Sequence, residues 1–193
     1  MPKLMIVIAS TRPGRVGLPV ARWFNDRAVE HGEFEIDLVD LAELDLPLMN
    51  EPNHPRLRQY THEHTRAWSE RVDAADAFVF VTSEYNHGYP APLKNAIDYL
   101  HNEWHDKPVG FVSYGGVAAG TRAMQQLKPV VSALKMVPMV EAVNIPFVAQ
   151  FIDDDENVVA NEVMEQAVVA MLHELNLMQE TLHRLREQRL ARR

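Results

Sequence analysis

Residues that can bind an anion gather in one short stretch near the N-terminus, ASTRPGRVGLPVARW. Ser10, Arg12 and Arg15 supply a hydroxyl and two guanidinium groups, and Gly14 and Gly17 permit tight turns before a helical pattern begins. Free amides at a helix start, together with guanidinium groups, bind phosphate. Because the chain carries a net charge of −8, a dianion needs local positive charge here. The stretch predicts a phosphate-monoester site; a capped helix start with solvated arginines is the alternative.

A second polar stretch, residues 83–92, separates an apolar run from an amphipathic pattern. Glu84 and Tyr85 follow the apolar run directly, and Asn86 and Gly88 lie in a segment that tolerates unusual backbone angles. Two prolines stiffen the approach to the next helix, and two tyrosines can cover a flat aromatic ligand. We expect a rigid turn that faces a ring; a structural turn with tyrosines packed on a sheet edge is the alternative.

The third stretch is formed by Ser113, Tyr114, Gly115 and Gly116. Glycine has no Cβ, so a ligand can approach these amides closely, although a plain glycine turn would look the same. Taken together, the three stretches describe a phosphate anchor, a ring-facing turn and a backbone wall. This is the outline of a mononucleotide with a planar ring, and FMN fits it.

The elements that must position these stretches alternate along the chain. Apolar runs of strand length alternate with helical patterns, the strands over about 3–10, 34–39, 77–82, 107–116 and 136–145. The helices are expected from residue 18, over about 61–75, 91–101 and 121–134, and from about 161 in a long C-terminal helix. This alternation predicts one doubly wound α/β domain over 1–193 with a parallel sheet and helices on both faces. Right-handed crossovers then bring all three stretches to the carboxyl edge, where such folds bind ligands.

These motifs resemble the NADPH-dependent FMN reductase family, over roughly residues 3–146. The family's Gly-Ser-x-Arg-x-x-Ser loop corresponds to Ala9–Arg15, with Arg15 in place of the last hydroxyl. Its Pro-Glu-Tyr-Asn motif reads Ser83–Asn86, and its Pro-x-x-Leu-Lys-Asn-Ala-Ile-Asp motif reads Pro90–Asp98. The resemblance implies a flavodoxin-like fold with strand order 2-1-3-4-5, non-covalent FMN and a nicotinamide reductant, NADPH or NADH. It also implies a homodimer or homotetramer with the flavin near the subunit interface.

The resemblance also implies a role for each stretch in two-electron reduction of flavin, quinone or a similar small-molecule electron acceptor. The first stretch would bind the phosphate through Ser10, Arg12, Arg15 and Gly17. The second would flank the ring through Glu84, Tyr85, Asn86 and Gly88. The third would line the pyrimidine edge through Ser113, Tyr114, Gly115 and Gly116. Because the cofactor carries the chemistry, no catalytic acid or base is expected.

Composition excludes several other classes of function. The chain has no cysteine, so it can form neither disulfides nor thiolate-bound iron–sulfur clusters. The net charge of −8 argues against nucleic acid or an anionic membrane as a partner, although residues 184–193 carry five arginines. The apolar run over 4–9 is too short for a signal segment or a membrane span, so a cytoplasmic protein is expected. His101 and His105 lack the His-Glu-x-x-His order and are interpreted as surface histidines, with no metal site.

Two rival functions stay open from the sequence. A flavodoxin-type electron carrier would share the fold, but its phosphate loop is rich in Thr and Ser rather than arginine. A receiver-like binding module would need acidic residues after the first and third strands, where this chain has Ser10-Thr11 and Ser83-Glu84. The last helix carries a heptad-like apolar stripe, so its second half is expected to form an oligomer contact or to fray.

Overall fold

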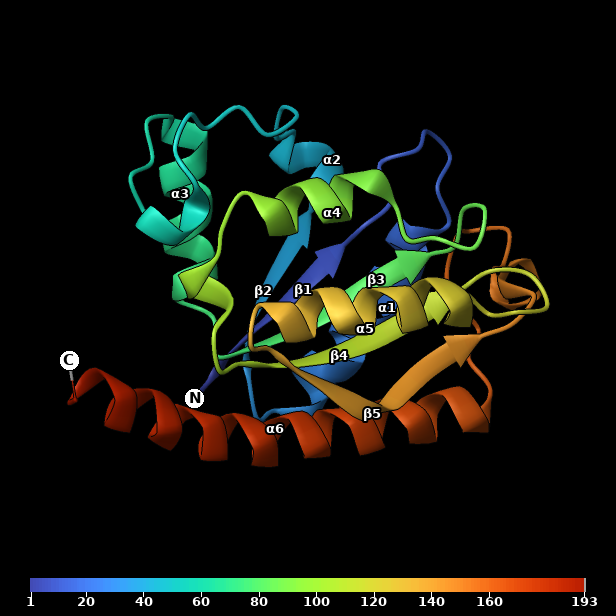
Figure 1. The fold of residues 1–193 in the computed structure, drawn as a ribbon. Coiled ribbons are helices and arrows are strands. Elements are labelled where there is room, and N and C mark those ends of the chain that lie inside the picture. Colours follow the sequence, from blue (N-terminus) through green and yellow to red (C-terminus); the bar gives the residue numbers. More distant parts are fainter. Residues whose placement is uncertain (193) are drawn as a thin grey trace.

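The computed structural model describes residues 1–192, and its centre is a five-stranded parallel sheet with the order β2-β1-β3-β4-β5 (Figure 1). The strands are β1 (Lys3–Ile8), β2 (Glu35–Asp40), β3 (Ala77–Ser83), β4 (Pro108–Tyr114) and β5 (Val137–Ile145). Every residue of β3 and β4 is buried, which explains why these strands are almost continuously apolar. The predicted sheet and its strand order are therefore confirmed.

Helices cover both faces of the sheet (Figure 1). They are α1 (Gly17–His31), α2 (Leu41–Leu44), α3 (Glu63–Asp73), α4 (Ala91–Asp98), α5 (Thr121–Ala133) and α6 (Glu162–Leu190), with 3-10 turns η1 (Pro55–Leu57), η2 (Asn102–Trp104) and η3 (Val148–Phe151). Side chains of α1 and α6 form one core layer with Leu4, Ile6 and Ile8. Those of α3, α4 and α5 form the other, with Met5 and Val7 from the opposite face of β1.

Two local elements differ from the sequence prediction. The helix expected over 91–101 ends at Asp98, because the buried indole of Trp104 donates a hydrogen bond to the carbonyl of Ile97, 3.1 Å away, and η2 follows. The short helix α2 was not predicted; Asp40 caps it by accepting from the amide of Ala42 at 2.9 Å. Propensity alone does not reveal the Trp104 contact, because it depends on packing, whereas the Asp40 cap is local but begins a helix of only four residues.

The C-terminal helix α6 begins where it was expected, with Asn161 Oδ1 accepting from the amide of Met164 at 2.9 Å. Its 29 residues correspond to about 43 Å at ~1.5 Å per residue, and Figure 1 shows it running beneath the whole sheet. Its second half is a continuous helix, attached to the sheet's amino edge. Arg186 donates to the carbonyl of Asp106 at 2.9 Å, and Arg189 contacts both carboxylate oxygens of Asp106 at 2.6 Å.

Candidate functional site

The loops after β1, β3 and β4 meet at the carboxyl edge of the sheet, as predicted. The first and second loops are joined directly, because Ser10 Oγ lies 3.0 Å from Tyr85 Oη. Ser10 is buried, whereas Tyr85 is 42% exposed. Tyr85 is thus accessible to a ligand while its hydroxyl is fixed.

The second loop is a tight turn closed by two backbone hydrogen bonds between Tyr85 and Gly88, each 2.9 Å long. Asn86 and His87 occupy the left-handed region, with φ of 51° and 69°. The expectation of unusual backbone angles in this segment is therefore confirmed. Gly88 itself does not have a positive φ, so the strained positions belong to the two residues before it.

The third loop is fixed by close backbone packing around Gly120. Its φ is 74°, and a Cβ at this position would lie 2.8 Å from the carbonyl oxygen of Tyr114. The segment after β5 supports the loop from the other side, since the amide of Val148 donates to Gly115 O at 3.0 Å. Gly116 is exposed, and a Cβ there would meet no atom within 4 Å. The loop therefore presents open backbone on a rigid support.

Two adjoining cavities lie between these loops. One, of about 170 Å³, is lined by hydroxyl-bearing residues of the first and second loops together with Arg12. The other, of about 300 Å³, lies between the Asn86–His87 turn and the third loop. Glu84 and Gly115 line both cavities, so the two cavities share part of their wall. Eight of the twelve predicted residues line them: Ser10, Arg12, Glu84, Tyr85, Asn86, Tyr114, Gly115 and Gly116.

The structure places the side chain of Arg15 away from the two cavities. Its guanidinium forms an ion pair with Asp40 at the end of β2, and both side chains are mostly buried. Arg12, by contrast, is exposed and donates only to the carbonyls of Pro13 and Gly14, at 3.2 and 3.3 Å, among the described residues. Arg12 is therefore the guanidinium of the first loop that remains available to an anion.

Gly17, Gly88 and Ser113 also lie outside the cavity walls, and packing explains this position for two of them. A Cβ at Gly17 would lie 2.4 Å from Tyr114 Oη, so this glycine makes room for the tyrosine hydroxyl. Ser113 is fully buried and donates to Asn144 Oδ1 at 2.8 Å, which uses its hydroxyl inside the sheet. Both residues shape the site from behind instead of facing it.

Glu84 is held by Arg122, a residue that sequence reasoning missed. Arg122 Nε lies 2.6 Å from Glu84 Oε1, and the amide of Arg122 donates to Glu84 Oε2 at 3.2 Å. Burial works to raise the pKa of Glu84, but the hydrogen bond and charge of Arg122 outweigh it and lower that pKa. The pair ties the second loop to the first turn of α5. In the sequence, only the presence of an arginine shortly after the glycine loop could have pointed to this ion pair.

Hydroxyl groups cluster in the smaller cavity. Ser83 Oγ is buried and has no hydrogen-bond partner among residues 1–192. Burial raises the pKa of Tyr114 to about 12, so this phenol stays protonated and can donate. For Tyr85, burial works to raise the pKa, yet the neighbouring hydroxyls of Ser10 and Ser83 and the guanidinium of Arg12 lower it overall. The cavity wall therefore offers hydroxyl donors beside one guanidinium group.

Comparison with known proteins identifies relatives over most of the chain. Residues 2–150 match the model of the family described as NADPH-dependent FMN reductase. An NAD(P)H-dependent FMN reductase of Schizosaccharomyces pombe is 42% identical over 149 residues, which cover 75% of this chain and 74% of that relative. An NAD(P)H-dependent FMN reductase of Saccharomyces cerevisiae is 40% identical over 146 residues, covering 69% and 75%.

The fold also resembles that of a solved flavoenzyme. The flavoenzyme NAD(P)H:(acceptor) oxidoreductase FerB of Paracoccus denitrificans superposes with a TM-score of 0.76 over 94% of this chain and 98% of that one. At 23% identity this likeness shows the fold alone. Within the described residues, no cluster of three or more potential ligands could hold a metal, and no helix is long and apolar enough to cross a membrane. On the family match and the two fungal relatives, this chain belongs to the NADPH-dependent FMN reductase family.

Proposed function

We propose that this chain is an FMN-dependent NAD(P)H oxidoreductase that reduces flavins, quinones or similar small acceptors by two-electron transfer. The observation that carries the proposal is the pair of adjoining cavities at the carboxyl edge. One is lined by hydroxyls and a guanidinium, the other by open glycine backbone, and they share Glu84 and Gly115. A phosphate with an attached planar ring needs this division of the site into two parts.

The donor set of the structure fits FMN. Ser83 Oγ is a buried polar atom with no hydrogen-bond partner among residues 1–192, and such atoms are expected to meet a bound group. Arg12 adds an exposed guanidinium beside it. On the ring side, Gly116 leaves open space where any larger residue would stand between the ligand and the backbone. We therefore assign the phosphate to Ser10, Arg12 and Ser83, and the ring to the wall from Tyr85 to Asn86 and from Gly115 to Gly116.

The residues of the chain act by binding and orienting. When bound, FMN would supply the reversible two-electron chemistry that side chains lack, accepting hydride from NAD(P)H. Tyr85 covers the site while its hydroxyl is held by Ser10. Arg122 keeps Glu84 ionised and so fixes the wall between the two cavities. The Asn86–His87 turn is closed by hydrogen bonds, so its amides need little reorganisation when a ligand binds.

We also propose that the protein is a homo-oligomer. Exposed apolar residues surround the site, namely Tyr85 (42%), Val117 (78%) and Phe147 (51%). Large exposed apolar side chains gathered beside a cavity are typical of a surface that a partner covers. A second subunit on this surface would exclude water from the ring. Analytical sedimentation tests this assembly.

We also propose a cytoplasmic location, because NAD(P)H is produced inside cells. Cell fractionation tests this location.

The proposed function is tested with the absorption spectrum of the purified protein, followed by anaerobic addition of NADPH or NADH. We expect a flavin spectrum that bleaches rapidly on reduction and returns when a quinone is added. Arg12→Ala should weaken FMN binding at least about tenfold and leave riboflavin binding unchanged, because it removes a charged contact to phosphate only. Arg22→Ala, an exposed arginine of α1, is the matched control. A protein that binds no flavin refutes the proposal, and slow bleaching by NADPH would favour an electron carrier.

A further inference from the structure

A third cavity, of about 440 Å³, lies at the amino edge of the sheet, opposite the three loops. Its walls come from the end of α3, the segments that precede β4 and β5, and the last turns of α6. The volume falls within the range of pockets that hold small organic molecules. The α6 residues that close it, including Arg186 and Arg189, lie outside residues 2–150, which the family model matches.

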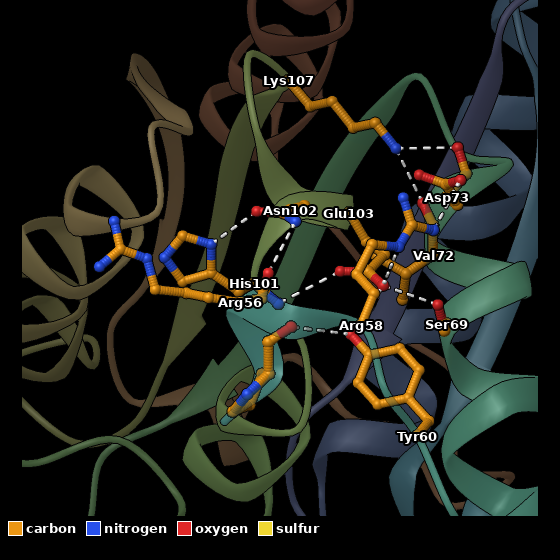
Figure 2. A network of polar contacts seen from close by, with 11 residues as sticks. Arg56, Arg58, Tyr60, Ser69, Val72, Asp73, His101, Asn102, Glu103 and Lys107 are labelled. Atoms are coloured by element: carbon orange, nitrogen blue, oxygen red, sulfur yellow. Dashed lines mark hydrogen bonds and ion pairs between the residues drawn. The ribbon is translucent and has the colours of Figure 1, made fainter. Parts of the chain in front are cut away.

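The floor of this cavity contains a buried lysine with one uncommitted donor. Lys107 is only 4% exposed, and its Nζ donates to the carbonyls of Val72 and Asp73, each 2.9 Å away (Figure 2). An ammonium group has three N–H donors, so two carbonyls leave one without a hydrogen bond, and Nζ also lies 5.7 Å from the centre of the Phe78 ring. Burial lowers the pKa of Lys107 to about 8, so the amine is mostly charged at neutral pH. The charges of Asp73 and Asp76 offset the cost of burying this ammonium only in part, so an anion placed next to it would stabilise it further.

Two further nitrogen donors line the same cavity as Lys107. His105 Nε2 is buried and has no hydrogen-bond partner in the described part of the chain. Lys135 is exposed and forms no ion pair with any described residue, and its carbonyl accepts from the amide of Asp106 at 3.0 Å. This bond joins the segment of Lys135 to that of His105 and Lys107. The sequence interpretation of His105 as a surface histidine is therefore wrong, because the ring is half-buried in a cavity wall.

Arginines pair with most of the carboxylates at this cavity. Arg189 contacts both oxygens of Asp106, and Arg186 lies 3.0 Å from Asp76 Oδ1. On the far wall, Arg58 pairs with Asp73 at 3.2 Å and with the buried Glu103 at 3.3 Å (Figure 2).

The remaining carboxylate, Glu187, is exposed at the rim and lies 3.4 Å from His183 Nε2. Arg58 is shared between Asp73 and Glu103, whereas neither Lys107 nor Lys135 forms an ion pair with a described carboxylate, so these two lysines are the cations of the cavity that a ligand can meet.

We propose that the amino-edge cavity is a second ligand site, which binds a small organic dianion, a phosphate ester or a dicarboxylate, through His105, Lys107 and Lys135. The site is separate from the flavin site, because the strands of the sheet stand between the two edges. The proposal does not depend on the proposed function.

The test is isothermal titration of the full-length chain, saturated with FMN, using inorganic phosphate and succinate as probes. We expect one probe ion to bind per chain, about tenfold more weakly in Lys135→Ala, because one charged contact is lost. Lys128→Ala, a lysine of α5 outside the cavity, is the matched control and should bind as wild type. Binding of phosphate alone identifies a phosphate ester as the ligand class, and binding of succinate alone identifies a dicarboxylate.

Two variants distinguish this site from the flavin site. Arg12→Ala should leave probe binding unchanged, and Lys107→Met, checked for folding by circular dichroism, should abolish it. Absence of binding for both probes overturns the proposal. So does probe binding that is lost in Arg12→Ala or weakened equally by Lys128→Ala, since the ion would then lie elsewhere. A flavin-free protein that still binds the probe would refute the proposed function and leave this proposal intact.

Discussion

The buried amine of Lys107 should make the stability of the protein rise with pH under alkaline conditions. Burial lowers the pKa of Lys107 from 10.5 to about 8, and the nearby charge of Asp73 opposes this only in part. Below about pH 8 the amine is protonated in both the folded and the unfolded chain. Between the two pKa values the unfolded chain binds a proton that the folded chain does not, so the free energy of unfolding increases with pH.

The size of this effect follows from the two pKa values. With 10.5 for the unfolded chain and about 8 for the folded one, the free energy of unfolding gains about 2 kcal/mol between about pH 7.5 and about pH 9.5. Lys107→Met removes the titrating group and should lose this gain. Higher pH is avoided, because burial raises the pKa of Tyr114 to about 12 and adds the opposite trend once the unfolded tyrosine ionises.

The assay is urea unfolding of wild type and variants at several pH values across this range, followed by circular dichroism. The difference between wild type and Lys107→Met isolates the contribution of this amine from all other titrations. Lys128→Met is the control for loss of a lysine outside the amino-edge cavity and should keep the wild-type slope. Equal slopes for wild type and Lys107→Met would show that the amine is not buried as described, and the reasoning would be refuted.

Three further predictions concern backbone and core, each measured by urea unfolding. Gly120→Ala should lower the free energy of unfolding by about 2–4 kcal/mol, because its Cβ would lie 2.8 Å from a carbonyl oxygen at a φ of 74°. Gly116→Ala should lower it by less than about 0.5 kcal/mol, because a Cβ there meets no atom within 4 Å. Similar losses for the two variants would contradict the loop geometry. Asn86→Val should cost about 1–3 kcal/mol at its φ of 51°, and Asn86→Gly should fold as wild type; equal stability of the two would argue against the left-handed turn. Leu175→Ala, in the core, should cost about 2–5 kcal/mol, while Leu177→Ala, 49% exposed, should stay within about 0.5 kcal/mol.

The sheet, its order and the edge that carries the site could be predicted because they depend on local patterns. An apolar run such as β3 is buried along its whole length, so its hydrophobicity is visible without any partner. Handed crossovers then determine which loops share an edge. The Asn86–His87 turn was also recognisable, since asparagine followed by histidine and glycine tolerates a left-handed backbone.

Pairings between distant side chains could not be predicted, because no local pattern encodes them. Arg15 reads as a phosphate ligand until Asp40, 25 residues later, is found beside it. Likewise Arg122 meets Glu84 across 38 residues, and Ser113 donates to Asn144 across 31. Each of these contacts fixes which polar groups remain free for a ligand. The fold thus follows from the periodicity of apolar residues. Which residues face the site depends on the pairs that side chains form with distant parts of the chain.

The attachment of α6 has a consequence for local opening of the molecule. Arg186 and Arg189, in the last turns of this helix, contact Asp106, which lies 80 and 83 residues earlier in the chain. Detaching these turns would remove one wall of the amino-edge cavity and leave the sheet and its three carboxyl-edge loops in place. Opening of the helix end, without unfolding of the sheet, would therefore be enough to expose this cavity.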